Sequence, residues 1–241
     1  MKKKIKFQNS RNLNLVGILY PSENKKIIIL VHGWCSNKDR KRFLKLANKL
    51  HEEGFGFLRF DQNSSGESEG DEITVKNLID DVKSAIKFVK NKGYKKIGLI
   101  GESLGGLTTL SISDNSIKAR VLFAPVTSKK TKDLEKYKEL MKNKDYFIKE
   151  KDGNRFKIPK RYLEERRLVN QKKLLSKIRL PVLILHGDND DKVPLETSKE
   201  AIKFLPKGSK LEIIKGAGHD LEEDYNKVIK LTTKWFKDNL K

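Results

Sequence analysis

Short apolar runs that alternate with longer amphipathic stretches are the feature that most restricts the fold of this chain. Residues 27–31 are continuously apolar, which is typical of a strand covered on both faces of a parallel sheet. Further strands are expected at 13–20, 55–60, 97–100, 121–124, 182–185 and 211–214, and helices at 39–53, 74–92, 196–205 and 225–240. Strands alternating with helices predict βαβ units, and therefore an α/β fold with a largely parallel sheet. The first strands have short connections and should be antiparallel.

One segment, residues 126–177, breaks this alternation. It is very basic and contains no apolar run of the kind that forms a buried strand. The pattern predicts a helix at 133–143, a hairpin at 146–158 around the Asp152-Gly153 pair, and a helical stretch at 159–170. We interpret the segment as a cap inserted over the sheet of a single domain, residues 1–241; a plain surface excursion is the alternative.

The chain has 241 residues and a strong positive charge, with 53 Lys and Arg against 32 Asp and Glu. Most of the basic residues are lysines spread along the whole chain, and no nucleic-acid-binding signature accompanies them. A lysine-rich solvated surface is therefore favoured, and no specific nucleic-acid partner is expected. The single cysteine, Cys35, excludes an intrachain disulfide. No secretory leader and no run long enough to span a membrane is recognised, so a soluble cytoplasmic protein is expected.

The sharpest motif is Gly101-Glu102-Ser103-Leu104-Gly105. It directly follows a predicted strand at 96–100 and precedes a helical stretch at 106–113, which is the order that a nucleophile elbow requires. In such a tight turn the backbone of the serine is strained and its hydroxyl is exposed. Gly101 and Gly105 lack the Cβ that would clash where strand and helix cross. The motif therefore predicts that Ser103 is a nucleophile.

A serine hydroxyl needs a base within hydrogen-bond reach, and the chain has four histidines. His51 is expected on the surface of a helix. His32 and His186 each end a strand before a glycine, and structural roles are expected for both. His219 follows the last strand in the glycine-rich loop 215–219, which can lift a side chain over the edge of the sheet, so it is the candidate base.

The base in turn needs an acid that fixes its tautomer. The loop at 186–194 supplies three carboxylates, Asp188, Asp190 and Asp191, and the residues alone do not separate them. Two backbone N–H groups could stabilise an oxyanion: that of Leu104, directly after the nucleophile, and that of Trp34, in the turn that follows the strand at 27–31.

Taken together, these motifs make the chain resemble α/β-hydrolases along nearly its full length. The matching stretches are His32-Gly33-Trp34, Arg59-Phe60-Asp61, Gly66 to Gly70, Gly101 to Gly106, His186-Gly187 with Asp190 and Val193-Pro194, and Gly218-His219. The resemblance implies a mostly parallel sheet of about eight strands with helices on both faces. It also implies that Asp190 is the acid of a Ser103–His219–Asp190 triad.

Within that superfamily the chain is similar to small serine esterases, which include cinnamoyl (feruloyl) esterases and monoacylglycerol-lipase-like enzymes. Those enzymes carry a short cap after the sixth strand, and residues 126–177 match it in place and size. The chain departs from the family in two places. Gln62-Asn63-Ser64-Ser65 stands where a glycine-rich run is common, and Glu102 stands where histidine is common. Both departures bear on the shape of the pocket and neither removes a catalytic group.

The expected function is hydrolysis of small carboxylic esters, with short, medium or aryl acyl groups, through an acyl-enzyme and without cofactor or metal. Aminopeptidase, thioesterase and perhydrolase activities use the same triad and stay open as alternatives, as does a homodimer. Nucleic-acid binding on a hydrolase scaffold and a non-catalytic receptor are the remaining rivals. Aromatic and sulfur side chains of the inserted segment either line an acyl pocket or anchor the segment: Tyr137, Met141, Tyr146, Phe147, Phe156 and Tyr162.

Overall fold

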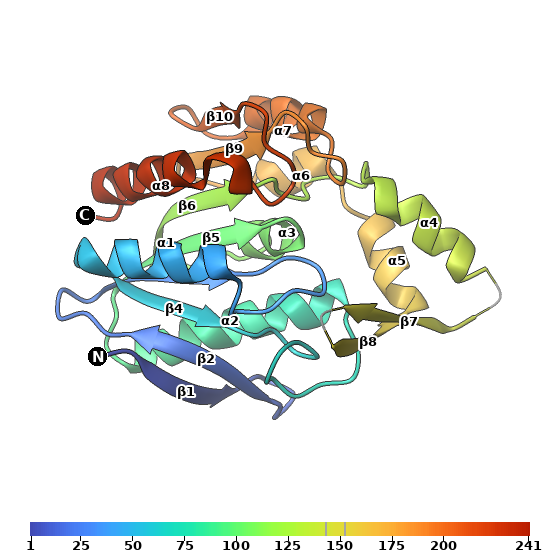
Figure 1. Cartoon of the computed structure of the whole chain (residues 1–241), viewed down its shortest axis with the longest axis horizontal. Coiled ribbons are helices and arrows are strands. Elements are labelled where there is room, and N and C mark those ends of the chain that lie inside the picture. The colour runs from blue at the N-terminus through green and yellow to red at the C-terminus, as the bar shows by residue number, and fades with distance from the viewer. Residues whose placement is uncertain (143, 152) are drawn as a thin grey trace.

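The computed structural model describes residues 1–142, 144–151 and 153–241. Its main body is one eight-stranded sheet with the strand order β1-β2-β4-β3-β5-β6-β9-β10 (Figure 1). The strands are β1 (Lys3–Gln8), β2 (Asn14–Tyr20), β3 (Lys26–Val31), β4 (Gly56–Phe60), β5 (Lys96–Glu102), β6 (Ile117–Phe123), β9 (Val182–Gly187) and β10 (Lys210–Ile214). Strand β2 pairs antiparallel with both β1 and β4, and every other pairing in this sheet is parallel. The prediction of a mostly parallel α/β sheet is confirmed.

Strand β3 shows why the central runs are apolar at every position. Ile28 and Leu30 belong to the core on one face, whereas Ile27, Ile29 and Val31 belong to the core on the other. Successive side chains of a strand point to opposite faces, so a strand covered on both sides must be apolar throughout.

Helices cover both faces of the sheet (Figure 1). Apolar side chains of α1 and α8 pack on one face, and those of α2 pack on the other. The helical segments are α1 (Lys41–Glu52), α2 (Val75–Asn91), α3 (Leu104–Leu110), α4 (Lys132–Leu140), α5 (Lys160–Arg167), α6 (Gln171–Leu175), α7 (Leu195–Ala201), α8 (Tyr225–Asn239), η1 (Ile202–Phe204) and η2 (Glu222–Asp224). None of them, in the part of the chain that is described, is long and apolar enough to cross a membrane.

Residues 126–177 are called the inserted segment, which contains α4, the hairpin of β7 (Tyr146–Lys151) and β8 (Asn154–Pro159), α5 and α6. Its α4, α5, β7 and β8 lie at one end of the molecule, whereas its α6 lies beside α7 of the main body (Figure 1). The hairpin forms a two-stranded sheet of its own and meets the main body where the Ile73 N–H donates to the Lys157 carbonyl, at 3.0 Å. The predicted hairpin is confirmed. Asp152 of its predicted turn pair and Asn143, the predicted end of the first helix, lie outside the described residues.

Three local predictions differ from the structure. Strand β1 was not expected, because four of its six residues are polar and only Phe7 in it is buried. It exists because β2 offers it a free edge to pair with. The helix after the elbow begins at Leu104 and ends at Leu110, earlier than the predicted 106–113, because the elbow passes directly into the helix. The short helix α6 was also not expected.

Candidate active site

Ser103 occupies a strained turn between β5 and α3. Its backbone has φ 51° and ψ −116°, a region that non-glycine residues rarely adopt. The turn is held by three backbone hydrogen bonds: the Ser103 N–H donates to Phe123, and the Ser103 carbonyl accepts from Gly106 and Val126, all at 2.9 Å. The predicted strain at this serine is therefore confirmed. These hydrogen bonds hold the turn in place, so the strained conformation persists.

Two glycines allow the backbone segments around Ser103 to approach one another. A Cβ on Gly105 would lie 2.3 Å from the Val31 carbonyl oxygen, so α3 could not begin this close to the end of β3 with any other residue. A Cβ on Gly33 would lie 3.1 Å from the Cβ of Ser103. The turn that contains Trp34 therefore packs directly against the serine.

Asp190 is the carboxylate that meets His219. Its side chain is fully buried, and Oδ2 accepts from His219 Nδ1 at 2.7 Å and lies 3.1 Å from His186 Nε2, which also lies 3.0 Å from the Val193 carbonyl oxygen. Its Oδ1 accepts from the backbone N–H groups of Lys192 and Val193, at 2.8 and 2.9 Å. Burial opposes ionisation, but the hydrogen bonds from His186 and His219 outweigh it and hold the pKa of Asp190 well below its usual range. The carboxylate is thus ionised and fixed in place.

The two neighbouring carboxylates on the same loop, Asp188 and Asp191, do not contact His219 in the described structure. Asp188 is exposed, and its Oδ1 accepts from the Gly216 N–H at 2.6 Å, so it holds together the loops after β9 and β10. Asp191 is exposed. The residues alone did not separate these three side chains, because all of them lie within four residues of one loop; the resemblance implied Asp190, and Asp190 is the one that contacts His219.

Ser103 and His219 line the same cavity, which has a volume of about 230 Å³. Because His219 donates Nδ1–H to Asp190, its Nε2 carries the lone pair that a general base needs. No hydrogen bond between Ser103 Oγ and His219 is present among the described residues. Such bonds are often long in the absence of substrate and tighten in the complex.

The predicted oxyanion donors flank the serine. Leu104 is the first residue of α3, where backbone N–H groups have no intrahelical acceptor. Trp34 follows Gly33, which packs against Ser103. Across the described residues, neither the Trp34 nor the Leu104 N–H is used in a hydrogen bond within the protein. Both donors are therefore available to a ligand.

The other histidines and the cysteine have structural surroundings. Buried His32 shares hydrogen bonds with the Gly33 carbonyl and the Gln62 N–H, and burial lowers its pKa, so it is a neutral structural residue. His51 is half-buried near the Phe55 carbonyl. His186 was expected to be structural, and it orients Asp190 while its own Nδ1 pairs with Ser198 Oγ at 2.8 Å. Burial raises the pKa of the Cys35 thiol to about 12, so it stays protonated at neutral pH.

Arg42 connects the elbow to the histidine loop. This buried residue of α1 donates from Nη2 to Glu102 at 2.6 Å and to Asp220 at 3.1 Å, and from Nη1 to Glu222 at 3.1 Å. Glu102 immediately precedes Ser103, and Asp220 immediately follows His219. Burial disfavours the charge of Arg42, but Glu102 and Asp220 raise its pKa above the ordinary value. The arginine thus holds the two sides of the site in a common position.

The first testable prediction concerns the ion pair between Arg42 and Glu102. The Arg42→Met variant should lose about 3–5 kcal/mol of unfolding free energy, because it leaves the Glu102 carboxylate buried without its partner. Urea denaturation measures the loss. The double variant Arg42→Met/Glu102→Gln should recover much of it, since the buried charge is then removed. Equal stability of the single and double variants would show that the pair has no such role.

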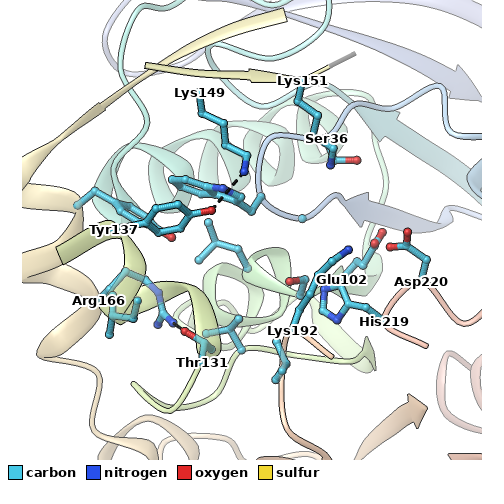
Figure 2. A pocket seen from close by; sticks show the side chains of 18 of the residues that line it. Ser36, Glu102, Thr131, Tyr137, Lys149, Lys151, Arg166, Lys192, His219 and Asp220 are labelled. Atoms are coloured by element: carbon cyan, nitrogen blue, oxygen red, sulfur yellow. Dashed lines mark hydrogen bonds between the residues drawn. The ribbon is translucent and has the colours of Figure 1, made fainter. Parts of the chain in front are cut away.

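Side chains from both the main body and the inserted segment line the cavity (Figure 2). Trp34 stacks on Tyr162 with ring centroids 4.4 Å apart and lies 5.7 Å from Tyr137. Of the six side chains considered for an acyl pocket, these two tyrosines line it. Met141 and Phe156 are buried in the core between the segment and α3, with Phe147 packed against it, and Tyr146 is exposed. The segment is therefore both anchored to the main body and part of the cavity wall.

The sequence reasoning missed two buried arginines, Arg42 and Arg166, that line the cavity. A signal existed for Arg42: it lies four residues before Leu46, on the apolar stripe of the predicted helix at 39–53. Arg166 offered no comparable signal, because it stands among other charged residues of α5.

Comparison with protein families finds one match for the chain. The family model described as serine aminopeptidase, S33, matches residues 22–176. That range contains β3, the Trp34 turn, the Ser103 elbow and most of the inserted segment.

Comparison with individual proteins finds distant relatives. The uncharacterized protein YfhR of Salmonella typhimurium (strain LT2) is 25% identical over 217 residues, which is 85% of this chain and 70% of that protein. Est1E from Butyrivibrio proteoclasticus, solved with bound ferulic acid, has a TM-score of 0.82 and 22% identity over 97% of this chain and 98% of its own. The Pyrococcus furiosus esterase Pf2001 has a TM-score of 0.79 and 20% identity over 100% of this chain and 94% of its own. At these identities the two structures establish a common fold.

Proposed function

The chain belongs to the α/β-hydrolase family described as serine aminopeptidase, S33, and from that membership we propose that it hydrolyses carboxylic esters with Ser103, His219 and Asp190 as its catalytic triad. One observation carries the proposal. Strained Ser103 and His219 line one cavity, and the Nδ1 of His219 lies 2.7 Å from the buried, ionised Asp190.

The reaction is a two-step acyl transfer. Ser103 Oγ attacks the ester carbonyl carbon while His219 Nε2 accepts the hydroxyl proton. The N–H groups of Trp34 and Leu104 stabilise the oxyanion of the tetrahedral intermediate, and each such donor contributes about 3 kcal/mol. His219 then gives the proton to the departing alcohol. Water, deprotonated by His219, attacks the acyl-enzyme and releases the acid by the same route.

Asp190 acts through His219. Its carboxylate fixes the tautomer that leaves Nε2 unprotonated, and it stabilises the imidazolium that forms during attack. His186 positions the carboxylate from the other side at 3.1 Å. The hydrogen bonds from His219 and from the Lys192 and Val193 N–H groups fix the orientation of Asp190.

The cavity supports substrates with a short or medium acyl chain or an aryl acid. About 230 Å³ of space is bounded by Trp34, Tyr137 and Tyr162 together with aliphatic residues such as Val126 and Leu134. Flat aromatic walls and aliphatic side chains bind apolar acyl groups by removing them from water. We propose that the inserted segment acts as the cap of this acyl site, since it supplies both tyrosines.

Aminopeptidase activity is the second candidate, because it is the activity in the family's description. Such a substrate carries an α-ammonium group, which needs a carboxylate to pair with. Among the described residues, the charged groups that line the cavity are two carboxylates, Glu102 and Asp220, and six cations: Arg40, Arg42, Lys149, Lys151, Arg166 and Lys192. Arg42 binds both carboxylates. This charge distribution disfavours a cationic substrate and supports the esterase.

The test compares p-nitrophenyl butyrate with amino-acid p-nitroanilides that have a free α-amino group. We expect kcat/KM to be at least about 100-fold higher for the ester, because the cationic wall rejects the ammonium group. Background rates are subtracted with the Ser103→Ala variant. Anilide turnover that equals or exceeds ester turnover would replace the esterase with a peptidase.

A further inference from the structure

Arg166 is a buried cation that forms no ion pair with any side chain the structure describes. It lies on α5, is only 2% exposed, and lines the same cavity as Ser103 (Figure 2). Its Nη1 and Nη2 reach the Ser128 carbonyl at 3.4 Å, and Nη2 reaches Thr131 Oγ1 at 3.3 Å. The Tyr162 hydroxyl is a further hydrogen-bond partner. These partners are all neutral. No carboxylate whose side chain the structure describes forms an ion pair with it.

Two other buried arginines, Arg42 and Arg120, differ from Arg166 in their partners or in their position. Arg42 is surrounded by three carboxylates. Buried Arg120 donates to the Ile112 carbonyl and does not line the cavity, and burial lowers its pKa to about 10. A guanidinium removed from water without an opposite charge is costly. Among these three residues, Arg166 alone combines that cost with a position from which a ligand in the cavity could supply the missing charge.

The chemistry of the ligand follows from the guanidinium. Its five N–H donors lie in a planar fork that pairs with both oxygens of a carboxylate, and one guanidinium neutralises one carboxylate charge. The recorded hydrogen bonds of Arg166 are long, at 3.3–3.4 Å, so shorter charge-assisted bonds would replace weak ones. The Thr131 hydroxyl beside it offers a further donor.

The rest of the cavity favours an anion as well. Lys149 and Lys151 of β7 and Lys192 of the acid loop also line the cavity (Figure 2). The inserted segment, residues 126–177, contains 18 basic and 8 acidic residues. An excess of one charge sign around a cavity raises the local concentration of oppositely charged substrate.

We propose that the substrates of this site are esters that carry an ionised carboxylate at the end remote from the scissile carbonyl, and that Arg166 is the specificity-determining residue that binds it. The inference rests on the proposed esterase function and narrows its substrate class. Arg166 touches the substrate's carboxylate and takes no part in the proton transfers at Ser103.

The experiment measures kcat/KM for p-nitrophenyl monoesters of adipic and suberic acid against the same compounds with the free acid capped as a methyl ester. The wild-type protein should prefer the acids by at least about 10-fold, since a hydrogen-bonded charge pair is worth that much. In Arg166→Gln the ratio of the rate for the acids to the rate for the methyl-capped esters should fall by about 10–100-fold. Arg166→Lys, which keeps the charge and loses the fork, should lie between the two.

Arg167→Gln is the matched control. It removes the same charge from the next residue of α5, which is exposed and does not line the cavity, so the acid-to-capped ratio should equal that of the wild type. Equal wild-type rates for acid and capped esters would overturn the inference whatever the variants do. A proportional fall for both substrates in Arg166→Gln, with a lower Tm, would assign Arg166 a structural role and overturn its assignment. Failure of the proposed function is distinguishable, because then the capped esters are not hydrolysed at all.

Discussion

Replacement of Ser103 by alanine should lower kcat/KM for p-nitrophenyl butyrate by about 10⁴-fold or more and abolish labelling by a fluorophosphonate probe. The variant lacks the only atom that can form the acyl-enzyme, whereas the oxyanion donors and the cavity remain. Alanine also has a Cβ, so the strained φ of 51° and the backbone hydrogen bonds of the elbow are retained. The Tm should therefore stay close to the wild-type value.

Ser111→Ala is the matched control for this variant. Ser111 follows the last turn of α3 and its hydroxyl donates to the Leu107 carbonyl at 2.8 Å, outside the cavity. It should keep wild-type hydrolysis and labelling. Hydrolysis by purified Ser103→Ala at more than about one tenth of the wild-type rate would refute the mechanism.

The second large effect is expected for Asp190→Asn, which should lower kcat by about 10³–10⁴-fold. An amide in place of the carboxylate can hold His219 in the opposite tautomer, with Nε2 protonated and unable to accept the proton of Ser103. The amide also cannot stabilise the imidazolium. Steady-state kinetics with p-nitrophenyl butyrate measure the loss, at a temperature where circular dichroism shows that the variant is folded.

Asp188→Asn and Asp191→Asn are the controls on the same loop. Each removes one negative charge within two residues of Asp190, and each should keep kcat within about 3-fold, because neither side chain contacts His219. Equal losses in all three variants would mean that the acid of the triad is misassigned.

The ionisation of Asp190 should also make the stability of the folded protein depend on pH. The folded-state pKa of Asp190 lies below the value of an unfolded aspartate, about 3.9. Its ionised form therefore contributes stability above that pH, and the contribution is lost as the pH falls through the folded-state pKa. The Tm difference between wild type and Asp190→Asn should be constant above about pH 5 and shrink at lower pH. A difference that grows on acidification would contradict this assignment.

The sequence predicted most of the sheet and the elbow because the signals for them are local. A strand covered on both faces needs an apolar residue at every position, as in β3, and the pattern is readable without knowing the neighbours. The elbow is equally local, since a strand, two glycines around a serine and a helix occupy consecutive positions. Strand β1 was not predicted, because its pairing with β2, and not its own composition, makes it a strand.

The sequence by itself therefore determined the α/β architecture, the strained serine turn and the loops that carry the acid and histidine candidates. The residues alone left three neighbouring aspartates open and the family resemblance implied Asp190; the tertiary structure brings Asp190 against His219, because burial and orientation on a loop depend on what packs against it. It also decided the roles of the arginines: Arg42 binds partners 60 to 180 residues away, and Arg166 lines the cavity beneath the inserted segment. Such contacts bring together distant parts of the chain, and no periodicity within one segment encodes them.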